Sequence, residues 1–262
     1  MAFLRWLNKS KQVVDPETAD WHIENFLWLM REFDGADAFN EAALVLPSVK
    51  FFKSSGKTGN ALACEIFEQV KAYCGMADWP VTLVADDNPL AKNQPGLMYQ
   101  PAAQKYALGT FSVDQGEIEI SYSTNLLAKP EQLVATFAHE LAHYLLAAAK
   151  TEPICTADEM EFLTDLTAVY LGFGVFLANS RFDFDQFGDT YQQGWQMQRS
   201  GYLPEADLIF GLALFLHFKK LGAEDARKFL KPHLGKLLDR AAEQVATCKS
   251  HMEGLSNTFD GN

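Results

Sequence analysis

His139-Glu140-Leu141-Ala142-His143, residues 139–143, is the stretch from which the fold and the chemistry of this chain can be worked out. Two histidines stand four residues apart, and Glu140 follows the first of them. On an α-helix the two histidines lie one turn apart on the same face, so both imidazoles can reach a single metal ion at about 2.0–2.1 Å. Glu140 is rotated from them by roughly 100° about the helix axis, where it can reach a water on the metal but not the metal itself. This pattern predicts a zinc site in which Glu140 is the general base.

The residues around this stretch predict a buried helix. Pro130 suits the first position of a helix, and Glu131 suits the positive end of its dipole. Apolar residues then recur at helical spacing: Leu133, Val134, Phe137, Leu141 and Leu145. A buried imidazole needs a polar partner, and one metal ion can serve both histidines. The alternative is a core helix in which each histidine has its own hydrogen-bond partner.

A catalytic zinc usually has three protein ligands, and the third is expected on the next predicted helix, at residues 158–178. Glu161 and Asp165 stand four residues apart there and share one helix face. One carboxylate can bind the metal while the other accepts a hydrogen bond from a ligand imidazole and so sets its tautomer. The residues alone leave open which carboxylate does which, and Glu159 is a further candidate ligand.

The rest of the chain predicts helices on both sides of a small sheet, which is an α+β arrangement. Further helices are expected at 15–45, 60–75, 204–221 and 223–247, strands at 79–84, 106–113 and 118–122, a turn at 114–116, a loop at 86–104 and an irregular, aromatic-rich connection at 180–200. Residues 1–150 are expected to form an N-terminal lobe with the sheet and the histidine helix. Residues 151–262 are expected to form a helical C-terminal lobe that completes one catalytic unit.

The composition of the chain indicates which partners and which cellular compartment to expect. The chain has 22 basic and 34 acidic residues and a formal net charge of −12, so nucleic acid is not an expected partner. Its four cysteines include no CxxC pair, which favours free buried thiols in a reducing compartment. No leader peptide and no run of about 20 apolar residues is recognisable, so we expect a soluble, cytoplasmic protein without stable membrane insertion.

With a glutamate and an aspartate four residues apart on the helix after His-Glu-x-x-His, the chain resembles the gluzincin metallopeptidases, of which thermolysin is the best-known member. The resemblance covers about residues 116–170. It implies a zincin-like fold with a small sheet, an active-site helix and a mainly helical C-terminal half. It also implies that Glu161 is the third zinc ligand and that Asp165 orients His139. The edge of the predicted strand Ile118–Tyr122 would bind extended substrate.

The whole chain also resembles an uncharacterised bacterial family whose members are expected to be metallopeptidases. The shared features, as they stand here, include Leu46-Pro47, Trp79-Pro80, Thr164-Asp165-Leu166, Leu171-Gly172-Phe173-Gly174 and Gly201-Tyr202-Leu203. This second resemblance implies a metallopeptidase but no particular substrate. The paired glycines, Gly172 and Gly174, predict either a kink in their helix or the close approach of another helix.

The function expected from these features is a zinc-dependent peptide-bond hydrolase acting on a peptide or protein substrate. Glu140 would take a proton from the zinc-bound water that attacks the scissile carbonyl. Tyr202 is the first candidate for stabilising the oxyanion, ahead of Arg199 and His217. The aromatic residues of 182–195 could line an apolar subsite or pack in the core.

Two rival functions remain at the level of sequence. One is a catalytically inactive zinc-binding regulatory or binding protein with a zincin fold. The other is a di-iron carboxylate bundle, which would need a second Glu-x-x-His on another helix, and the chain has none. The pattern carries no indication of the oligomeric state.

Overall fold

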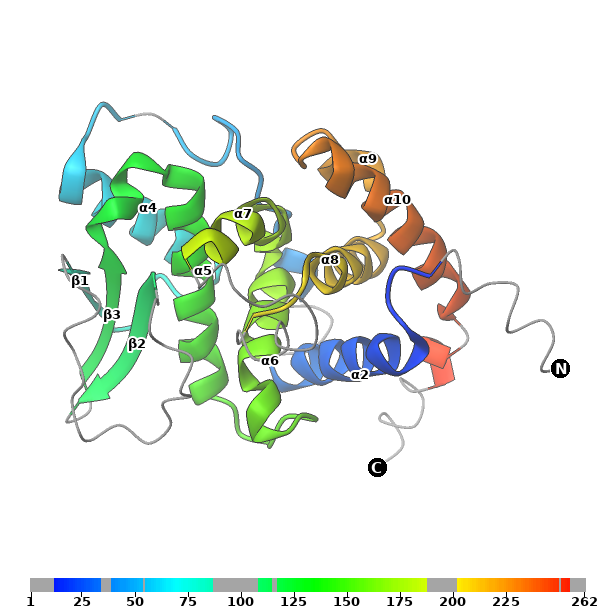
Figure 1. The fold of residues 1–262 in the computed structure, drawn as a ribbon. Helices are drawn as coiled ribbons and strands as arrows, with labels where there is room; N and C mark the ends of the chain where they lie inside the picture. The colour runs from blue at the N-terminus through cyan, green and yellow to red at the C-terminus, as the bar shows by residue number, and fades with distance from the viewer. Residues whose placement is uncertain are drawn as a thin grey trace, which may run out of the picture.

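The computed structural model describes residues 12–33, 39–53, 55–86, 108–114, 117–187, 202–249 and 251–254, with the backbone alone at 114 and 182–187. Within these residues the fold is mixed α+β, mostly helical with one three-stranded sheet. Figure 1 shows the sheet on the left of the molecule and most of the helices to its right. The α+β class predicted from the sequence is confirmed at this level.

The sheet consists of β1 (Thr82–Asp86), β2 (Gly109–Asp114) and β3 (Glu117–Ser123) in the order β1-β3-β2. β3 pairs with β1 in parallel and with β2 in antiparallel register. Both edges of β3 are therefore occupied, and the prediction that the strand Ile118–Tyr122 offers an edge to substrate is wrong. β1 and β2 are the two strands that have no partner on their outer side among the described strands, and β2 is the one that lies beside the histidine helix.

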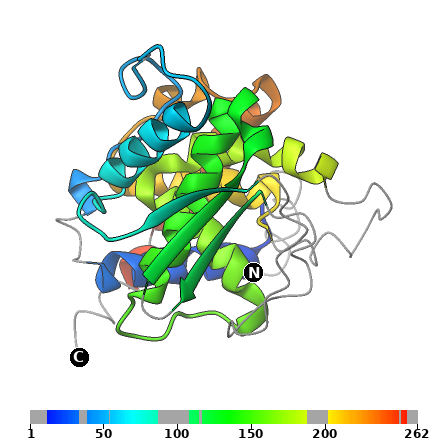
Figure 2. The ribbon, with the colours of Figure 1, turned by 90° about the vertical axis from the view of Figure 1, so that its left-hand side faces the viewer.

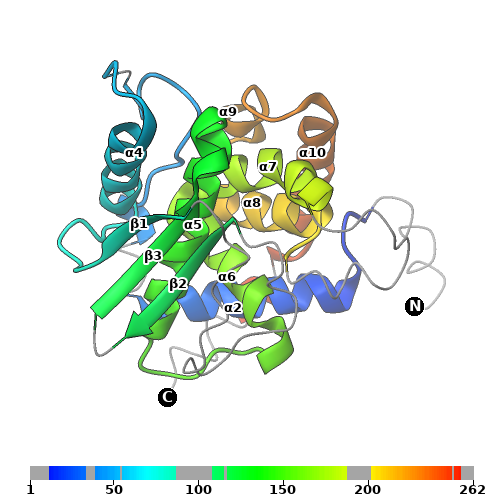
Figure 3. The ribbon, with the colours of Figure 1, turned by 60° about the vertical axis from the view of Figure 1, so that its left-hand side comes forward.

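The histidine helix, α5 (Pro130–Ala147), lies against the sheet and follows a short 3-10 turn, η2 (Thr124–Ala128). Pro130 stands in its first turn, as predicted, and α5 is buried along most of its length. Phe137 is fully buried between Tyr122 of β3 and Phe67 of α4 (Gly59–Tyr73), with ring centroids 5.5 and 5.1 Å away. Figures 2 and 3 show the sheet in front of α5.

After α5 the chain forms one long helical stretch with an irregular centre. It comprises η3 (Ala157–Glu159), α6 (Met160–Ala168), the π-helical turn η4 (Val169–Phe173) and α7 (Gly174–Phe187). Gly172 has a positive φ of 96°, and its carbonyl accepts a hydrogen bond from Val45 N–H at 3.0 Å. The kink predicted from the glycines is confirmed. The irregular connection predicted from residue 180 is wrong for 180–187, where α7 continues.

The remaining helices surround α8 (Glu205–Lys219), which is buried from Leu208 to Leu216. α2 (Pro16–Glu32) and α10 (Pro232–Thr247) pack against α8. The single helix predicted at 223–247 is wrong, because α9 (Ala223–Arg227) ends before Pro232 starts α10. The helix predicted at 15–45 is also too long, since α2 ends at Glu32.

One hydrophobic core takes in residues from α2, α5, α8 and α10. The lobe boundary expected at residue 150 stays a prediction. One described helical stretch, Ala157–Arg181, is long and apolar enough to cross a membrane, with a mean hydropathy of 1.4. Because 83% of its apolar window is buried inside the fold, it is compatible with the core helix of a soluble protein.

The four cysteines are free, as expected. Burial raises the pKa of the Cys74 thiol above its usual range and that of Cys155 to about 11, so both thiols stay protonated near neutral pH. Cys64 is exposed, so the prediction that all four thiols are buried is wrong for it, and the other three cysteines are only partly buried.

Candidate metal centre

Two helices bring three candidate ligands together. His139 and His143 project from one face of α5, and Glu161 projects from the first turn of α6. The Oε2 atom of Glu161 lies 3.4 Å from Nε2 of His139 and 3.5 Å from Nε2 of His143. Ligand atoms of the three residues all lie within 4.8 Å of one another.

These separations can be compared with the geometry of zinc. Four ligands at about 2.0–2.1 Å in a tetrahedron stand roughly 3.3–3.4 Å apart. The two nitrogen-to-oxygen distances, 3.4 and 3.5 Å, agree with that value. Two imidazole nitrogens and one carboxylate oxygen are also a common set of three protein ligands for a catalytic zinc, with the fourth position left open. The residues could therefore hold a metal ion, and the two distances to Glu161 agree with those of a zinc site.

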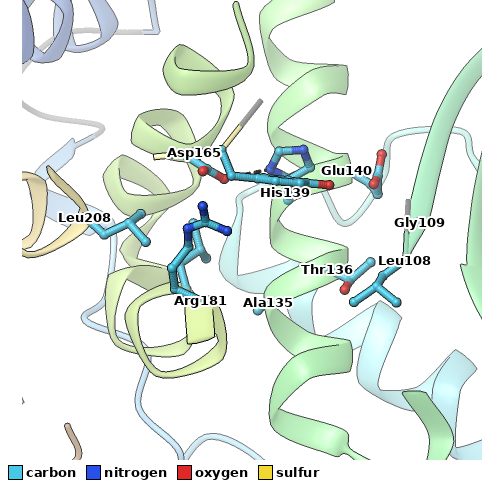
Figure 4. Close-up of a pocket in the computed structure, with 11 residues that line it drawn as sticks. Leu108, Gly109, Ala135, Thr136, His139, Glu140, Asp165, Arg181 and Leu208 are labelled. Atoms are coloured by element: carbon cyan, nitrogen blue, oxygen red, sulfur yellow. Dashed lines mark hydrogen bonds and ion pairs between the residues drawn. The ribbon is translucent and has the colours of Figure 1, made fainter. Parts of the chain in front are cut away.

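Asp165 lies on the other side of the His139 ring. Its Oδ1 atom is 2.9 Å from Nδ1 of His139, an interaction drawn as a dashed line in Figure 4. An ionised carboxylate only accepts hydrogen bonds, so Nδ1 donates to it, and Nε2 is the nitrogen left to bind a metal once its own proton is released. The other carboxylate oxygen accepts a hydrogen bond from Leu203 N–H at 2.8 Å. Asp165 thus joins a candidate ligand to the segment that leads into α8, and it stands outside the cluster of ligand atoms.

Thr164 has the corresponding position at His143. Its Oγ1 atom is 3.3 Å from Nδ1 of His143 and donates a hydrogen bond to the carbonyl of Met160 at 2.8 Å. Because the hydroxyl proton is used on Met160, the oxygen remains to accept from Nδ1–H of His143. Sequence reasoning had missed this role. The signal available was the spacing of three residues from Glu161, which puts both side chains on one face of α6.

Glu140 is buried beside the first strand residue of β2. A Cβ atom built on Gly109 would lie 2.8 Å from Oε1 of Glu140 and 2.6 Å from the Thr136 methyl group. Burial raises the pKa of Glu140, the positive charges of His139 and His143 oppose the rise, and the charge of Glu161 adds to it. A raised pKa brings a carboxylate closer to the operating range of a general base. Nothing in the sequence around Gly109 indicated this contact.

The charge states of the ligands follow from their neighbours. Burial alone would raise the pKa of Glu161, but hydrogen bonds from His139 and His143 hold it well below its usual range. Burial alone would lower the pKa of His139, but its bonds to Asp165 and Glu161 raise it well above its usual range. Glu161 is thus ionised, which is the form of a carboxylate that binds metal.

Tyr202 lies at the same site from the segment before α8. Its ring centroid is 5.3 Å from that of His139, and the Arg181 guanidinium carbon is 5.7 Å from the Tyr202 ring centroid. Burial and the negative charges of Glu140 and Asp165 raise the pKa of Tyr202, so its phenol stays protonated and can donate a hydrogen bond.

The other candidates from the sequence stand elsewhere. His217 is nine residues beyond Leu208, the α8 residue at the site, which is roughly 13 Å along the helix. Glu159 accepts hydrogen bonds from the backbone N–H and hydroxyl of Thr156 and caps the start of η3. Arg199 and residues 188–195 lie outside the described residues, as do the side chains of 182–187.

A small cavity opens between His139, Glu140 and Arg181, as Figure 4 shows. Its volume is about 20 Å³, enough to hold a water molecule. The cavity therefore has room for a small reactant beside the candidate base.

Comparison of the chain with protein-family models, with characterised proteins and with solved structures found no match.

Proposed function

We propose that this protein is a zinc metallopeptidase of the gluzincin type with a zincin-like fold. The observation that carries the proposal is the position of Glu161, whose Oε2 atom lies 3.4 Å from Nε2 of His139 and 3.5 Å from Nε2 of His143, as in a tetrahedral zinc site. A structural pair of core histidines would not need a carboxylate shared between both Nε2 atoms and a buried glutamate beside them.

Zinc bound by these ligands would lower the pKa of a water molecule and polarise the peptide carbonyl. Glu140 is the group that accepts the proton of the attacking water and returns it to the leaving amine. The protonated phenol of Tyr202 donates a hydrogen bond to the oxyanion that forms on the carbonyl. Asp165 and Thr164 hold the two imidazoles so that each Nε2 atom faces the metal.

The outer edge of β2 is the proposed binding site for an extended peptide. Gly109, at the start of β2, lies against Glu140, and Phe111 stacks on His143 with an interplanar angle of 11° and a centroid distance of 6.3 Å. Backbone hydrogen bonds along an edge strand bind a peptide without regard to its sequence, and side-chain pockets then select. The proposed partners are a peptide or protein substrate, and the proposed location is the cytoplasm.

The test compares the zinc-loaded wild type with Glu140→Gln on a mixture of unstructured peptides, with cleavage products identified by mass spectrometry. We expect the wild type to cleave peptides and Glu140→Gln to bind one zinc per chain while cleaving about 10²–10⁴ times more slowly. Equal rates in the two proteins would contradict the role of Glu140. Absence of cleavage by the zinc-loaded wild type would favour the alternative of an inactive zinc-binding protein.

A further inference from the structure

The cavity beside Glu140 has apolar walls and one unusual polar group. Its walls come from Leu108, Ala135, Leu177 and Leu208. Thr136 stands among them, four residues before Glu140 and therefore one turn away on the same face of α5. The cavity is thus continuous with the proposed catalytic residues and lies between α5, α7 and the beginning of α8.

The hydroxyl of Thr136 has no hydrogen-bond partner within the described part of the chain, although Thr136 is only 3% exposed. Buried threonines on a helix commonly donate to the carbonyl four residues earlier, as Thr167 does to Leu163 at 2.7 Å. Thr136 makes no such bond. Its methyl group faces Gly109, and Figure 4 shows its oxygen on the side away from Gly109. A buried hydroxyl left unpaired destabilises a fold, so its retention needs an explanation.

We infer that this cavity is the subsite for a substrate residue next to the scissile bond, and that Thr136 makes it select a small, neutral side chain that forms hydrogen bonds, such as serine. The inference rests on the proposed function. The cavity volume of about 20 Å³ admits a group of the size of one water molecule and excludes the side chains of leucine and phenylalanine. The carboxylates of Glu140 and Asp165 and the guanidinium of Arg181 all lie at its border, so their charges offset one another and favour a neutral side chain.

We expect the site to prefer serine over alanine because a buried hydroxyl without a hydrogen-bond partner is unfavourable. A serine hydroxyl in the cavity can form a hydrogen bond with Thr136, whereas an alanine side chain offers it no partner. One such hydrogen bond corresponds to about a tenfold preference. Thr136→Val keeps the shape of the side chain and removes the hydroxyl, so this substitution should abolish the preference.

The experiment compares two peptides that are identical except for one position, which is serine in one and alanine in the other. That position is next to the bond that the wild type cleaves. If the wild type cleaves nothing, each position of a peptide that it binds is varied in turn. Binding is measured on zinc-loaded Glu140→Gln and on Glu140→Gln/Thr136→Val, because neither turns over. We expect the serine peptide to bind about tenfold more tightly to the first protein and equally well to the second. Thr167→Val, in the Glu140→Gln background, is the matched control and should keep the tenfold preference.

A measurement without peptide supports the same point. Thr136→Val should raise the melting temperature, because it removes an unpaired buried hydroxyl, whereas Thr167→Val should lower it, because it removes a formed hydrogen bond. Equal binding of both peptides to Glu140→Gln, or an unchanged serine preference in the double variant, would overturn the inference and leave the proposed function intact. A serine preference in binding, together with no cleavage by the wild type, would overturn the proposed function and leave the subsite.

Discussion

The two candidate ligand imidazoles are oriented by two different kinds of group, a carboxylate and a hydroxyl. His139 donates to the carboxylate of Asp165 at 2.9 Å, whereas His143 is 3.3 Å from the hydroxyl of Thr164. Partners of this kind fix the tautomer of a ligand histidine, and their loss commonly costs about 10–100-fold in metal affinity. The hydroxyl can act as an acceptor only because its own proton is used on the Met160 carbonyl. The α6 helix therefore supplies a ligand and both orienting groups from one face.

Thr164→Val tests whether the hydroxyl of Thr164 orients the imidazole of His143. We expect zinc affinity to fall about 10-fold or more, because Nδ1–H of His143 loses its acceptor and the imidazole its orientation. Affinity is measured by competition with a chromophoric chelator. Thr167→Val also removes a buried threonine hydroxyl from α6 but touches no ligand, so its zinc affinity should equal that of the wild type. Equal affinity in Thr164→Val would mean that the 3.3 Å contact does not orient the ring.

Gly109 is a second residue on which the site depends. A methyl group there would meet Glu140 Oε1 and the Thr136 methyl, so Gly109→Ala should displace the carboxylate. A displacement of about 1 Å in a catalytic group can lower the rate by about 10²-fold. We expect peptide cleavage to fall by that factor while zinc content stays at that of the wild type, since no ligand moves. Cleavage at the wild-type rate would show that Glu140 accommodates the methyl group or is not the base.

At the scale of elements, the irregular centre of the long helical stretch is the feature that departs most from a regular pattern. The π-helical turn η4 lies directly between α6, which carries Glu161 and Asp165, and α7, which carries Arg181. A π-helical turn changes the register of the residues that follow it, and such turns occur frequently at functional sites. Gly172 permits this turn and lets the chain segment at Ala43 approach closely.

Gly172→Ala tests the importance of this turn. The substitution adds a side chain at φ 96° and brings it into collision with the Ala43 carbonyl oxygen, so we expect a loss of roughly 3 kcal/mol in the free energy of unfolding. Gly56→Ala is the control, because Gly56 also has a positive φ, 74°, but has open space around its Cβ position. It should cost only the backbone strain, about 1–2 kcal/mol. Urea unfolding of both variants measures the difference, and equal losses would show that the Ala43 contact carries no cost.

At the scale of the whole molecule, the metal centre joins two consecutive helices that pack on each other but have different further neighbours. α5 packs on the sheet and on α4, while α6 packs on α2 and α8. A zinc ion held by His139, His143 and Glu161 would cross-link α5 to α6, and a ligand that binds only the folded protein stabilises it. The stability of the molecule should therefore depend on metal.

Zinc removal tests this dependence. Zinc at about a thousand times its Kd stabilises a folded protein by about 4 kcal/mol, and in a chain of this size that corresponds to a rise in melting temperature of roughly 10 °C. We expect that rise when zinc is added to chelator-treated wild type, as followed by calorimetry. His143→Ala should show little or no rise. A rise of the same size in His143→Ala would mean that zinc binds at another site.

Local rules account for the part of the site that lies on one helix. The relation of His139, Glu140 and His143 follows from the 3.6-residue period, and Pro130 marks the start of their helix. The buried positions of that helix also follow from apolar spacing. The same rules locate Glu161 and Asp165 on one face of the next helix, but they cannot separate a ligand from an orienting group, since both residues are one turn apart.

Tertiary structure decided the rest. The packing of α6 on α5 puts Glu161 at both Nε2 atoms and Asp165 at Nδ1 of His139. The order β1-β3-β2 gives β1 and β2, and not β3, a free outer side among the described strands, because strand pairing joins segments far apart in sequence. Gly109 and Thr136 owe their roles to contacts across elements, for which a local pattern carries no signal. The relative positions of side chains on one helix follow from their spacing in the sequence. Contacts between side chains of two elements depend on how those elements pack.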